Sequence, residues 1–196
     1  MHTSIFSFAA LASVLVAAIP TEPVKVHWKA PKVGDKFGIA ATGKGISNID
    51  LTASKGRIFI GGKQNPSCDR GVSQASANFR LNEDSSISLY KTDNPPQDLW
   101  AKWASSGGYV GYTTGVQPPP AKSRRTGFKV NPDTRVLTFD GFGGKACPTG
   151  EDHKWSLWFT DSGKPGYLNG CVDVVLKASV RDAAVSCLYS EGPNEE

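Results

Sequence analysis

Apolar and polar residues alternate with a period of two along most of the chain after Val24, and turn-forming residues interrupt the alternation every eight to twelve positions. The segments GRIFIGG, VLTFDG, WSLWFTD and CVDVVLKASV are therefore predicted to be strands. In the last of them, Val172, Val174 and Leu176 are expected on one face and Asp173 and Lys177 on the other. Residues 96–106 (PQDLWAKWASS) could form one or two helical turns at most. The pattern predicts an all-β chain of about ten to twelve short strands.

One twelve-residue pattern occurs twice, as FRLNEDSSISLY at 79–90 and as FKVNPDTRVLTF at 128–139. In the first copy, apolar residues are expected to share one face, and oxygens of Asn82, Asp84 and Ser85 to cap a tight turn. The second copy matches it at five positions, Phe128, Val130, Asn131, Asp133 and Val136. Each copy is predicted to be a β-hairpin whose role is structural.

The fold class expected from this pattern is a single-domain antiparallel β-sandwich or barrel of short strands, formed by residues 19–190. A β-trefoil is the alternative, because hairpins that begin at 79 and 128, 49 residues apart, could mark two lobes of a three-fold repeat. The segment IDLTASKGRIFI offers only a shifted, partial third copy, so the sandwich or barrel is favoured.

The two ends of the chain are expected to lie outside this domain. Residues 1–18 resemble a secretory signal peptide, with an apolar run from Phe8 to Ile19 and small residues at Ala17 and Ala18. A membrane anchor is disfavoured because the run is shorter than the roughly 20 residues that span a bilayer. The polar and acidic residues 191–196 are expected to form a flexible tail. The sequence thus predicts a secreted protein that does not bind a membrane.

Charge and cysteine spacing exclude several classes of ligand. The chain has 22 Lys and Arg against 18 Asp and Glu, a net charge of +4, which is too small and dispersed to indicate nucleic-acid binding. None of the cysteines lies in a CxxC spacing, so no zinc or other metal site is expected, and no cofactor motif is present. In an oxidising compartment Cys68, Cys147, Cys171 and Cys187 are expected to pair, and their spacing alone allows three connectivities.

The sequence lacks the usual signs of catalytic machinery. It has no GxSxG or HExxH motif, and His153 stands next to Asp152 in a polar turn, where adjacent side chains point apart. Four carboxylates could be paired in a glycosidase, namely Asp140, Glu151, Asp161 and Asp173, although turns and a solvated strand face account for them. The chain is therefore predicted not to be an enzyme, with a glycan-cleaving enzyme as the least favoured alternative.

Aromatic residues give the strongest indication of a ligand. Flat exposed rings can stack on the apolar faces of sugars, and a nearby basic loop could bind acidic glycans. The loop TGVQPPPAKSRRTG at 114–127 is expected to be extended and exposed. Trp155 and Trp158 lie on opposite faces of one predicted strand, with Trp155 expected in the core. The candidate ligand-binding residues are Trp100, Trp103, Tyr109, Tyr112, Lys122, Arg124 and Arg125.

A resemblance to a known family rests on several short segments in a fixed order. GRIFIGGK with Cys68, KACPTG before KWSLWF, GCVDVVLKA and the closing VSCLYS resemble the secreted fungal cell wall proteins of the PhiA type, also described as IgE-binding or allergen-like, over residues 46–190. The chain departs from the family pattern after Cys171 and in its basic triple-proline loop. The resemblance implies disulfides Cys147 to Cys171 and Cys68 to Cys187, and it supplies no catalytic residue.

The resemblance also implies a function. We expect a secreted, non-enzymatic protein of the fungal cell wall that contacts wall polysaccharide and is linked to hyphal and conidial development. The alternative is a secreted effector or elicitor that binds a host protein or receptor through the surface between Trp100 and Arg125. Fractionation distinguishes the two, because a wall protein stays with washed walls.

Overall fold

The computed structural model describes residues 26–27, 29–64 and 66–190, so the predicted signal peptide 1–18 and acidic tail 191–196 lie outside the described residues. The regular elements of the described chain are strands and three short 3-10 turns, in agreement with the all-β expectation. The strands are β1 (Val26–His27), β2 (Lys36–Gly43), β3 (Ile46–Ser54), β4 (Arg57–Gly61), β5 (Ser67–Cys68), β6 (Phe79–Leu81), β7 (Ile87–Leu89), β8 (Gln97–Lys102), β9 (Val110–Thr114), β10 (Ser123–Arg124), β11 (Phe128–Val130), β12 (Leu137–Phe139), β13 (Gly144–Pro148), β14 (Lys154–Phe159), β15 (Val172–Arg181) and β16 (Cys187–Leu188). The 3-10 turns are η1 (Asp69–Gly71), η2 (Ala104–Ser106) and η3 (Pro165–Tyr167).

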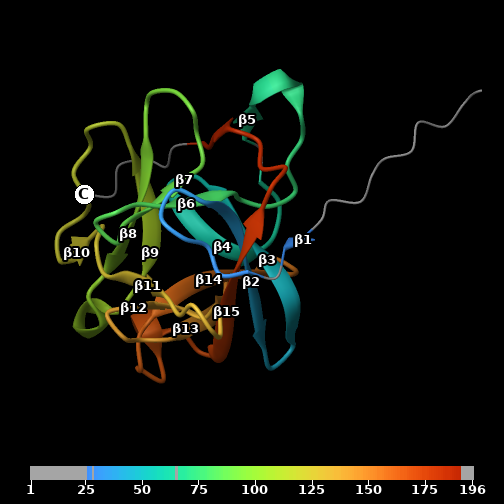
Figure 1. Cartoon of the computed structure of the whole chain (residues 1–196). Helices are drawn as coiled ribbons and strands as arrows, with labels where there is room; N and C mark the ends of the chain where they lie inside the picture. Colours follow the sequence, from blue (N-terminus) through green and yellow to red (C-terminus); the bar gives the residue numbers. More distant parts are fainter. Residues whose placement is uncertain (1–25, 28, 65, 191–196) are drawn as a thin grey trace, which may run out of the picture.

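Antiparallel pairing closes the main sheet on itself. Six strands form a continuous circuit in the order β2, β3, β4, β14, β13, β15, and β15 pairs with β2 along Phe37 to Gly43 to complete it. A second arm of four strands, β6 to β9, leaves β2 and returns to β4, where Arg57 pairs with Gly111. The strands wrap around a common interior (Figure 1). The predicted sandwich or barrel class is confirmed in this barrel-like form.

The two copies of the repeated pattern are hairpins that occupy different environments. The β6–β7 hairpin belongs to the main sheet, whereas β11–β12 forms a separate two-stranded ribbon beside β15. The copies contact each other, since the Phe128 N–H donates to the Ser85 carbonyl at 3.2 Å. The two copies therefore differ in their sheet partners, unlike the equivalent lobes that the trefoil alternative requires.

The second hairpin differs from the first by one residue in its loop. In the first copy Phe79 pairs with Leu89, but in the second Phe128 pairs with Phe139, which shifts the register by one residue. The expected match of Val136 with Ile87 is therefore wrong, because the residue that pairs with Val130 is Leu137. Asn131 accounts for the longer loop, since its side-chain oxygen accepts bonds from two successive backbone N–H groups, at 2.9 and 2.8 Å.

The core follows the predicted alternation. On β15, Val174, Leu176 and Ala178 are buried, while Asp173, Val175 and Lys177 are exposed. Residues 96–106 depart from the expected helical turns: Gln97 to Lys102 form β8, and only Ala104–Ser106 make a 3-10 turn. Pairing with β7, β9 and β10 provides hydrogen bonds along β8, so tertiary pairing decides the conformation of this segment.

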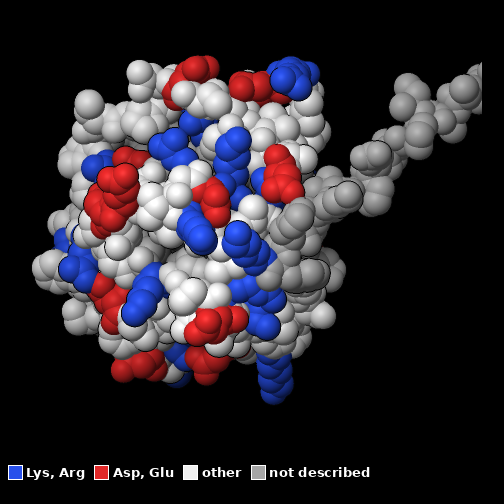
Figure 2. Space-filling model, in the orientation of Figure 1, with Lys and Arg blue, Asp and Glu red and all other residues white. Residues whose placement is uncertain are grey.

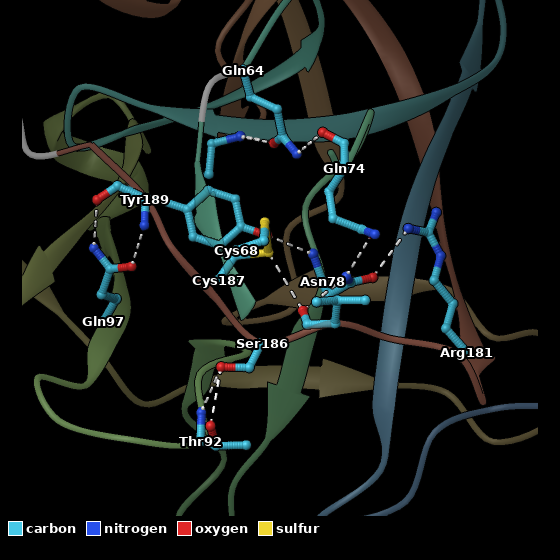
Figure 3. Close-up of a disulfide and its surroundings, with 12 residues drawn as sticks. Gln64, Cys68, Gln74, Asn78, Thr92, Gln97, Arg181, Ser186, Cys187 and Tyr189 are labelled. Atoms are coloured by element: carbon cyan, nitrogen blue, oxygen red, sulfur yellow. Dashed lines mark hydrogen bonds between the residues drawn. A yellow bond between two sulfur atoms is a disulfide. The ribbon is translucent and has the colours of Figure 1, made fainter. Parts of the chain in front are cut away.

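The carboxyl-terminal strand β16 pairs with β5 in a separate two-stranded sheet, and a disulfide and buried polar contacts hold it to the rest of the domain (Figure 3). Cys187 is bonded to Cys68, and a second disulfide joins Cys147 to Cys171, which is the pairing that the family resemblance implied. The Tyr189 hydroxyl accepts a hydrogen bond from the Asn78 backbone N–H at 3.1 Å. Burial is the main cause that raises the pKa of Tyr189 above its ordinary value. This segment is an integral part of the fold.

Candidate functional site

The structure separates the predicted ligand-binding aromatics into buried and accessible residues. Tyr112 is part of the hydrophobic core. Trp100 lies on the opposite face of the sheet, but its indole packs against the backbone of Gly111 and only 5% of the residue is exposed. Neither ring offers a free face to a sugar, and Tyr109, with 8% of its surface exposed, is nearly as buried as Trp100. Trp103 does offer an accessible ring, since 49% of its surface is exposed, and it lies between β8 and η2.

The basic loop lies along β8. Ser123 pairs with Lys102, and the Trp103 N–H donates to the Lys122 carbonyl at 2.9 Å, so the backbones of Trp103 and Lys122 lie side by side. Arg124 forms an ion pair with Asp140, and the guanidinium of Arg125 donates to the Thr113 hydroxyl at 2.8 Å. These two arginines therefore hold the exposed loop against its neighbours.

An aromatic cluster crosses the outer face of β8, β9 and β14. The ring of Tyr109 lies 6.0 Å from that of Trp100 and 4.8 Å from that of Trp158, both measured between centroids. The guanidinium of Arg57 lies over the Tyr109 ring, 5.1 Å from its centroid. Alternation places these side chains opposite Leu99, Ala101 and Val110, which face the core.

A surface pocket of about 310 Å³ opens over this cluster. Its lining is aromatic and cationic, consisting of Arg57, Lys102, Ser106, Gly107, Tyr109, Trp158 and Gly166. Its volume is at the lower end of the roughly 300–1,000 Å³ typical of small-molecule sites. The pocket joins strands that are far apart in the sequence, because β4 and β14 reach the β8–β9 hairpin only when the sheet closes.

Two glycines shape the pocket around the indole of Trp158. A Cβ atom on Gly166 would lie 2.7 Å from Trp158 Cη2, and one on Gly107 would lie 3.3 Å from Trp158 Cζ3. Gly166 also has φ of +56°, a conformation that side chains disfavour. The same two loops carry the exposed aromatics, since Trp103 precedes η2 and Tyr167, 95% exposed, follows Gly166. We call the exposed Trp103 and Tyr167, together with the half-buried Trp158 and the buried Tyr109, the aromatic face.

The polar groups of the pocket favour hydrogen-bond donation. Burial raises the pKa of the Tyr109 phenol to about 12, and the nearby Arg57 charge opposes this only in part. Tyr109 is therefore a neutral phenol at ordinary pH. Arg57 and Lys102 are both cations, and no carboxylate is among the described residues that line the pocket. The Tyr109 hydroxyl is itself buried, so the pocket offers a ligand an apolar surface with positive charge beside it.

The carboxylates considered for glycosidase chemistry lie elsewhere. Asp140 pairs with Arg124, Asp173 with Lys145, and Glu151 with Lys154 at 2.8 Å. Three of the four carboxylates are therefore engaged in ion pairs, an ordinary role for carboxylates at a protein surface. Within the part of the chain that the structure describes, no group of three or more His, Cys, Asp or Glu could hold a metal ion.

The distribution of charge agrees with the modest net charge of +4. On the face shown in Figure 2, Lys and Arg are interspersed with Asp and Glu, and no large area carries one sign. A nucleic-acid surface normally presents a concentrated basic patch. Among residues 26–27, 29–64 and 66–190, no helix is long and apolar enough to cross a membrane.

Sequence reasoning missed most of the pocket. Of the residues that line it, only Tyr109 was among the predicted ligand-binding residues, although the position of Trp158 on the strand face opposite Trp155, which packs against the core, was a usable signal. Tyr167 gave no signal, because a single tyrosine in a glycine-rich loop has no pattern around it.

Comparison with known proteins identifies relatives over most of the chain. Residues 37–190 match the model of the PhiA-like secreted protein family. Proteins named cell wall protein phiA are similar to this chain: one from Aspergillus niger is 32% identical over 91% of this chain and 95% of its own length. One from Aspergillus fumigatus is 35% identical over 79% of this chain and 85% of its own length. One from Emericella nidulans is 32% identical over 94% of this chain and 97% of its own length. No solved structure matches the chain.

These findings confirm the family expected from the sequence, together with the secreted, cell-wall location that was expected with it. The family match covers the closed sheet, both disulfides and every residue of the pocket. The chain belongs to the PhiA-like secreted protein family.

Proposed function

We propose that this protein is a non-enzymatic component of the fungal cell wall that is held there by contact between wall polysaccharide and the aromatic face. The observation that carries the proposal is the pocket over Tyr109 and Trp158, flanked by loops that expose Trp103 and Tyr167. Aromatic rings at the surface of a disulfide-bonded β domain offer flat apolar area at little entropic cost. The names of the relatives support the location.

The exposure of Trp103 and Tyr167 is the second support for this proposal. Within the described residues, the exposed large hydrophobic side chains number six, and the two aromatic ones, Trp103 and Tyr167, are those next to the pocket. Exposed aromatics are costly to leave in water, and their gathering in one place marks a contact surface. The link to hyphal and conidial development is part of the same proposal. It follows because a protein located in the wall takes part in building the hyphae and conidia that the wall encloses.

Retention on washed fungal walls tests the proposal. The secreted protein is mixed with walls from which bound protein has been stripped, and the retained fraction is compared between wild type and a Trp103→Ala, Tyr167→Ala double variant. Both side chains are exposed, so the double variant keeps the fold and loses at least about tenfold in retention. Val175→Ala, which removes another exposed apolar side chain from β15, is the matched control and leaves retention unchanged.

Two results would count against the proposal. Equal retention of wild type and double variant removes the aromatic face as the contact. Absence of retention for the wild type removes the polysaccharide contact itself, and a host protein partner, as in the effector alternative, becomes the function to examine.

A further inference from the structure

Tyr167 is the one tyrosine of this chain whose ring is open to solvent. The sequence contains five tyrosines, and all five lie among the described residues. Tyr167 is 95% exposed, whereas none of the other four is more than 9% exposed. These four are Tyr90, Tyr109, Tyr112 and Tyr189. A reagent too large to enter the fold therefore reaches a single phenol in the folded protein.

The buried phenols are also held by their surroundings. The Tyr112 hydroxyl donates to the Ser190 carbonyl, and the Tyr189 hydroxyl accepts from the Asn78 N–H at 3.1 Å. Burial raises the pKa of Tyr109 to about 12, so its phenol keeps its proton at ordinary pH. A radical formed on one of these rings would be enclosed by packed side chains, where the ring of another molecule cannot approach it.

The turn that carries Tyr167 is held in place although its ring is exposed. The Tyr167 N–H donates to the Lys164 carbonyl at 3.1 Å, and Pro165, at the start of η3, is buried. Gly166 lies so close to the Trp158 ring that a Cβ atom on it would be 2.7 Å from that ring. Tyr167 has φ of +62°, a conformation that bulky side chains disfavour. A strained backbone that presents an exposed ring is typical of functional positions.

An accessible phenol has a well-defined oxidative chemistry. A haem peroxidase takes one electron from the phenol, the O–H proton is lost with it, and a phenoxyl radical remains. Two such radicals join through the ring carbons next to the carbon that bears oxygen. The hydrogen on each joined carbon then moves to oxygen, which restores both phenols. Hydrogen peroxide accepts the two electrons and two protons and is reduced to two molecules of water.

We infer that Tyr167 is an oxidative cross-linking site, at which hydrogen peroxide and a haem peroxidase join two copies of this chain through a carbon–carbon bond between their Tyr167 rings. Each copy has one accessible phenol, so the product is a closed dimer that does not grow into a longer chain. The inference goes beyond the proposed function, because a covalent dimer does not depend on contact between the aromatic face and polysaccharide.

The first experiment treats the purified secreted protein with a haem peroxidase and hydrogen peroxide. We expect a dimer that survives boiling in detergent and reductant and shows the blue fluorescence of coupled phenols. After reduction and digestion, mass spectrometry should find two peptides that contain Tyr167 joined with the loss of two hydrogen atoms. Without peroxide the protein should remain a monomer on a denaturing gel.

Three variants locate the bond. Tyr167→Phe removes the hydroxyl but keeps the ring, and its dimer should fall to the level seen without peroxide. Tyr90→Phe makes the same change at a buried phenol, whose ring lies 4.9 Å from Lys36 Nζ, and it should form the dimer like wild type. Trp103→Phe changes the other exposed aromatic ring and should also form the dimer. Thermal unfolding of each variant verifies that the fold is retained.

The second experiment looks for the same bond in washed walls of the fungus that produces the protein. Protein released by boiling the walls in detergent and reductant is digested, and the joined Tyr167 peptides are expected for wild type and not for Tyr167→Phe. Absence of these peptides in wild type, absence of the dimer in the purified protein, or equal dimer formation by Tyr167→Phe overturns the inference. None of these results bears on the proposed function, since Tyr167→Phe keeps the ring and its retention on stripped walls is measured separately.

Discussion

The side-chain amide of Gln97 makes the two backbone hydrogen bonds that a neighbouring strand would give to Tyr189. Gln97 Nε2 donates to the Tyr189 carbonyl at 3.0 Å, and the Tyr189 N–H donates to Gln97 Oε1 at 2.8 Å (Figure 3). Gln97 is fully buried, so water cannot replace either bond. One polar side chain therefore fixes the carboxyl-terminal segment to β8.

Replacing Gln97 by leucine should be severely destabilising. Gln97→Leu keeps similar volume but leaves both a donor and an acceptor of Tyr189 unpaired, at about 1–3 kcal/mol for each group. We expect a loss of about 2–6 kcal/mol in the free energy of unfolding, measured by denaturant titration. Gln117→Leu, in the exposed loop after β9, is the matched control and should change stability by less than about 0.5 kcal/mol. Similar losses in both variants would contradict the role of Gln97.

The two disulfides should differ in their contributions. Cys68–Cys187 spans 119 residues and Cys147–Cys171 spans 24. Under the chain-entropy model these loops correspond to about 5 and about 3.5 kcal/mol. The double variant Cys68→Ala, Cys187→Ala should therefore lose more stability than Cys147→Ala, Cys171→Ala. Thermal unfolding should show it melting at the lower temperature. The reverse order would show that native contacts outweigh the loop length.

Stability should fall steeply at alkaline pH through Tyr109. Its pKa is raised from 10.0 to about 12, so between these values the unfolded chain loses the proton while the folded chain retains it. The contribution of Tyr109 to the free energy of unfolding is fully present below pH 10. Between pH 10 and 12 it declines by up to about 1.4 kcal/mol per pH unit. The decline should be smaller in Tyr109→Phe, as measured by denaturant titration across this range. Parallel curves for the two proteins would contradict the assignment to Tyr109.

Gly166 gives a test of how the pocket is built. Gly166→Ala places a methyl group 2.7 Å from the Trp158 ring at a φ of +56°, so it should cost about 1–2 kcal/mol and change the tryptophan fluorescence. Gly163→Ala, in the same loop, meets no atom within 4 Å and should have little effect on either readout. An unchanged fluorescence spectrum in Gly166→Ala would mean that Trp158 does not pack on this loop.

The hairpins illustrate what a local pattern can establish. Alternation and the Asn-x-Asp turns identify β6–β7 and β11–β12, because strand period and turn chemistry are local properties. The one-residue register shift in the second hairpin is not visible in the aligned letters, since it depends on how Asn131 closes its loop. The assignment of one hairpin to the sheet and the other to a separate ribbon is set by long-range pairing.

The candidate site shows the limit of the same reasoning. Trp100 and Tyr112 belong to aromatic-rich, glycine-rich sequence that looks exposed, but β8 pairs with β9 and buries both rings. Arg57 and Trp158 come from β4 and β14, which reach Tyr109 only through closure of the sheet. Trp103 stays exposed because it lies beyond the end of β8, where pairing with β9 stops.

The most direct test of the central claim is fractionation of a growing culture of the fungus that produces this protein. The protein is quantified in washed walls and in culture fluid for wild type, the Trp103→Ala, Tyr167→Ala variant and the Val175→Ala control. The account predicts wild type and control mainly in the wall, and the double variant released mainly to the fluid with unchanged thermal stability. Equal wall retention of all three proteins would contradict the claim that the aromatic face holds the protein in the wall.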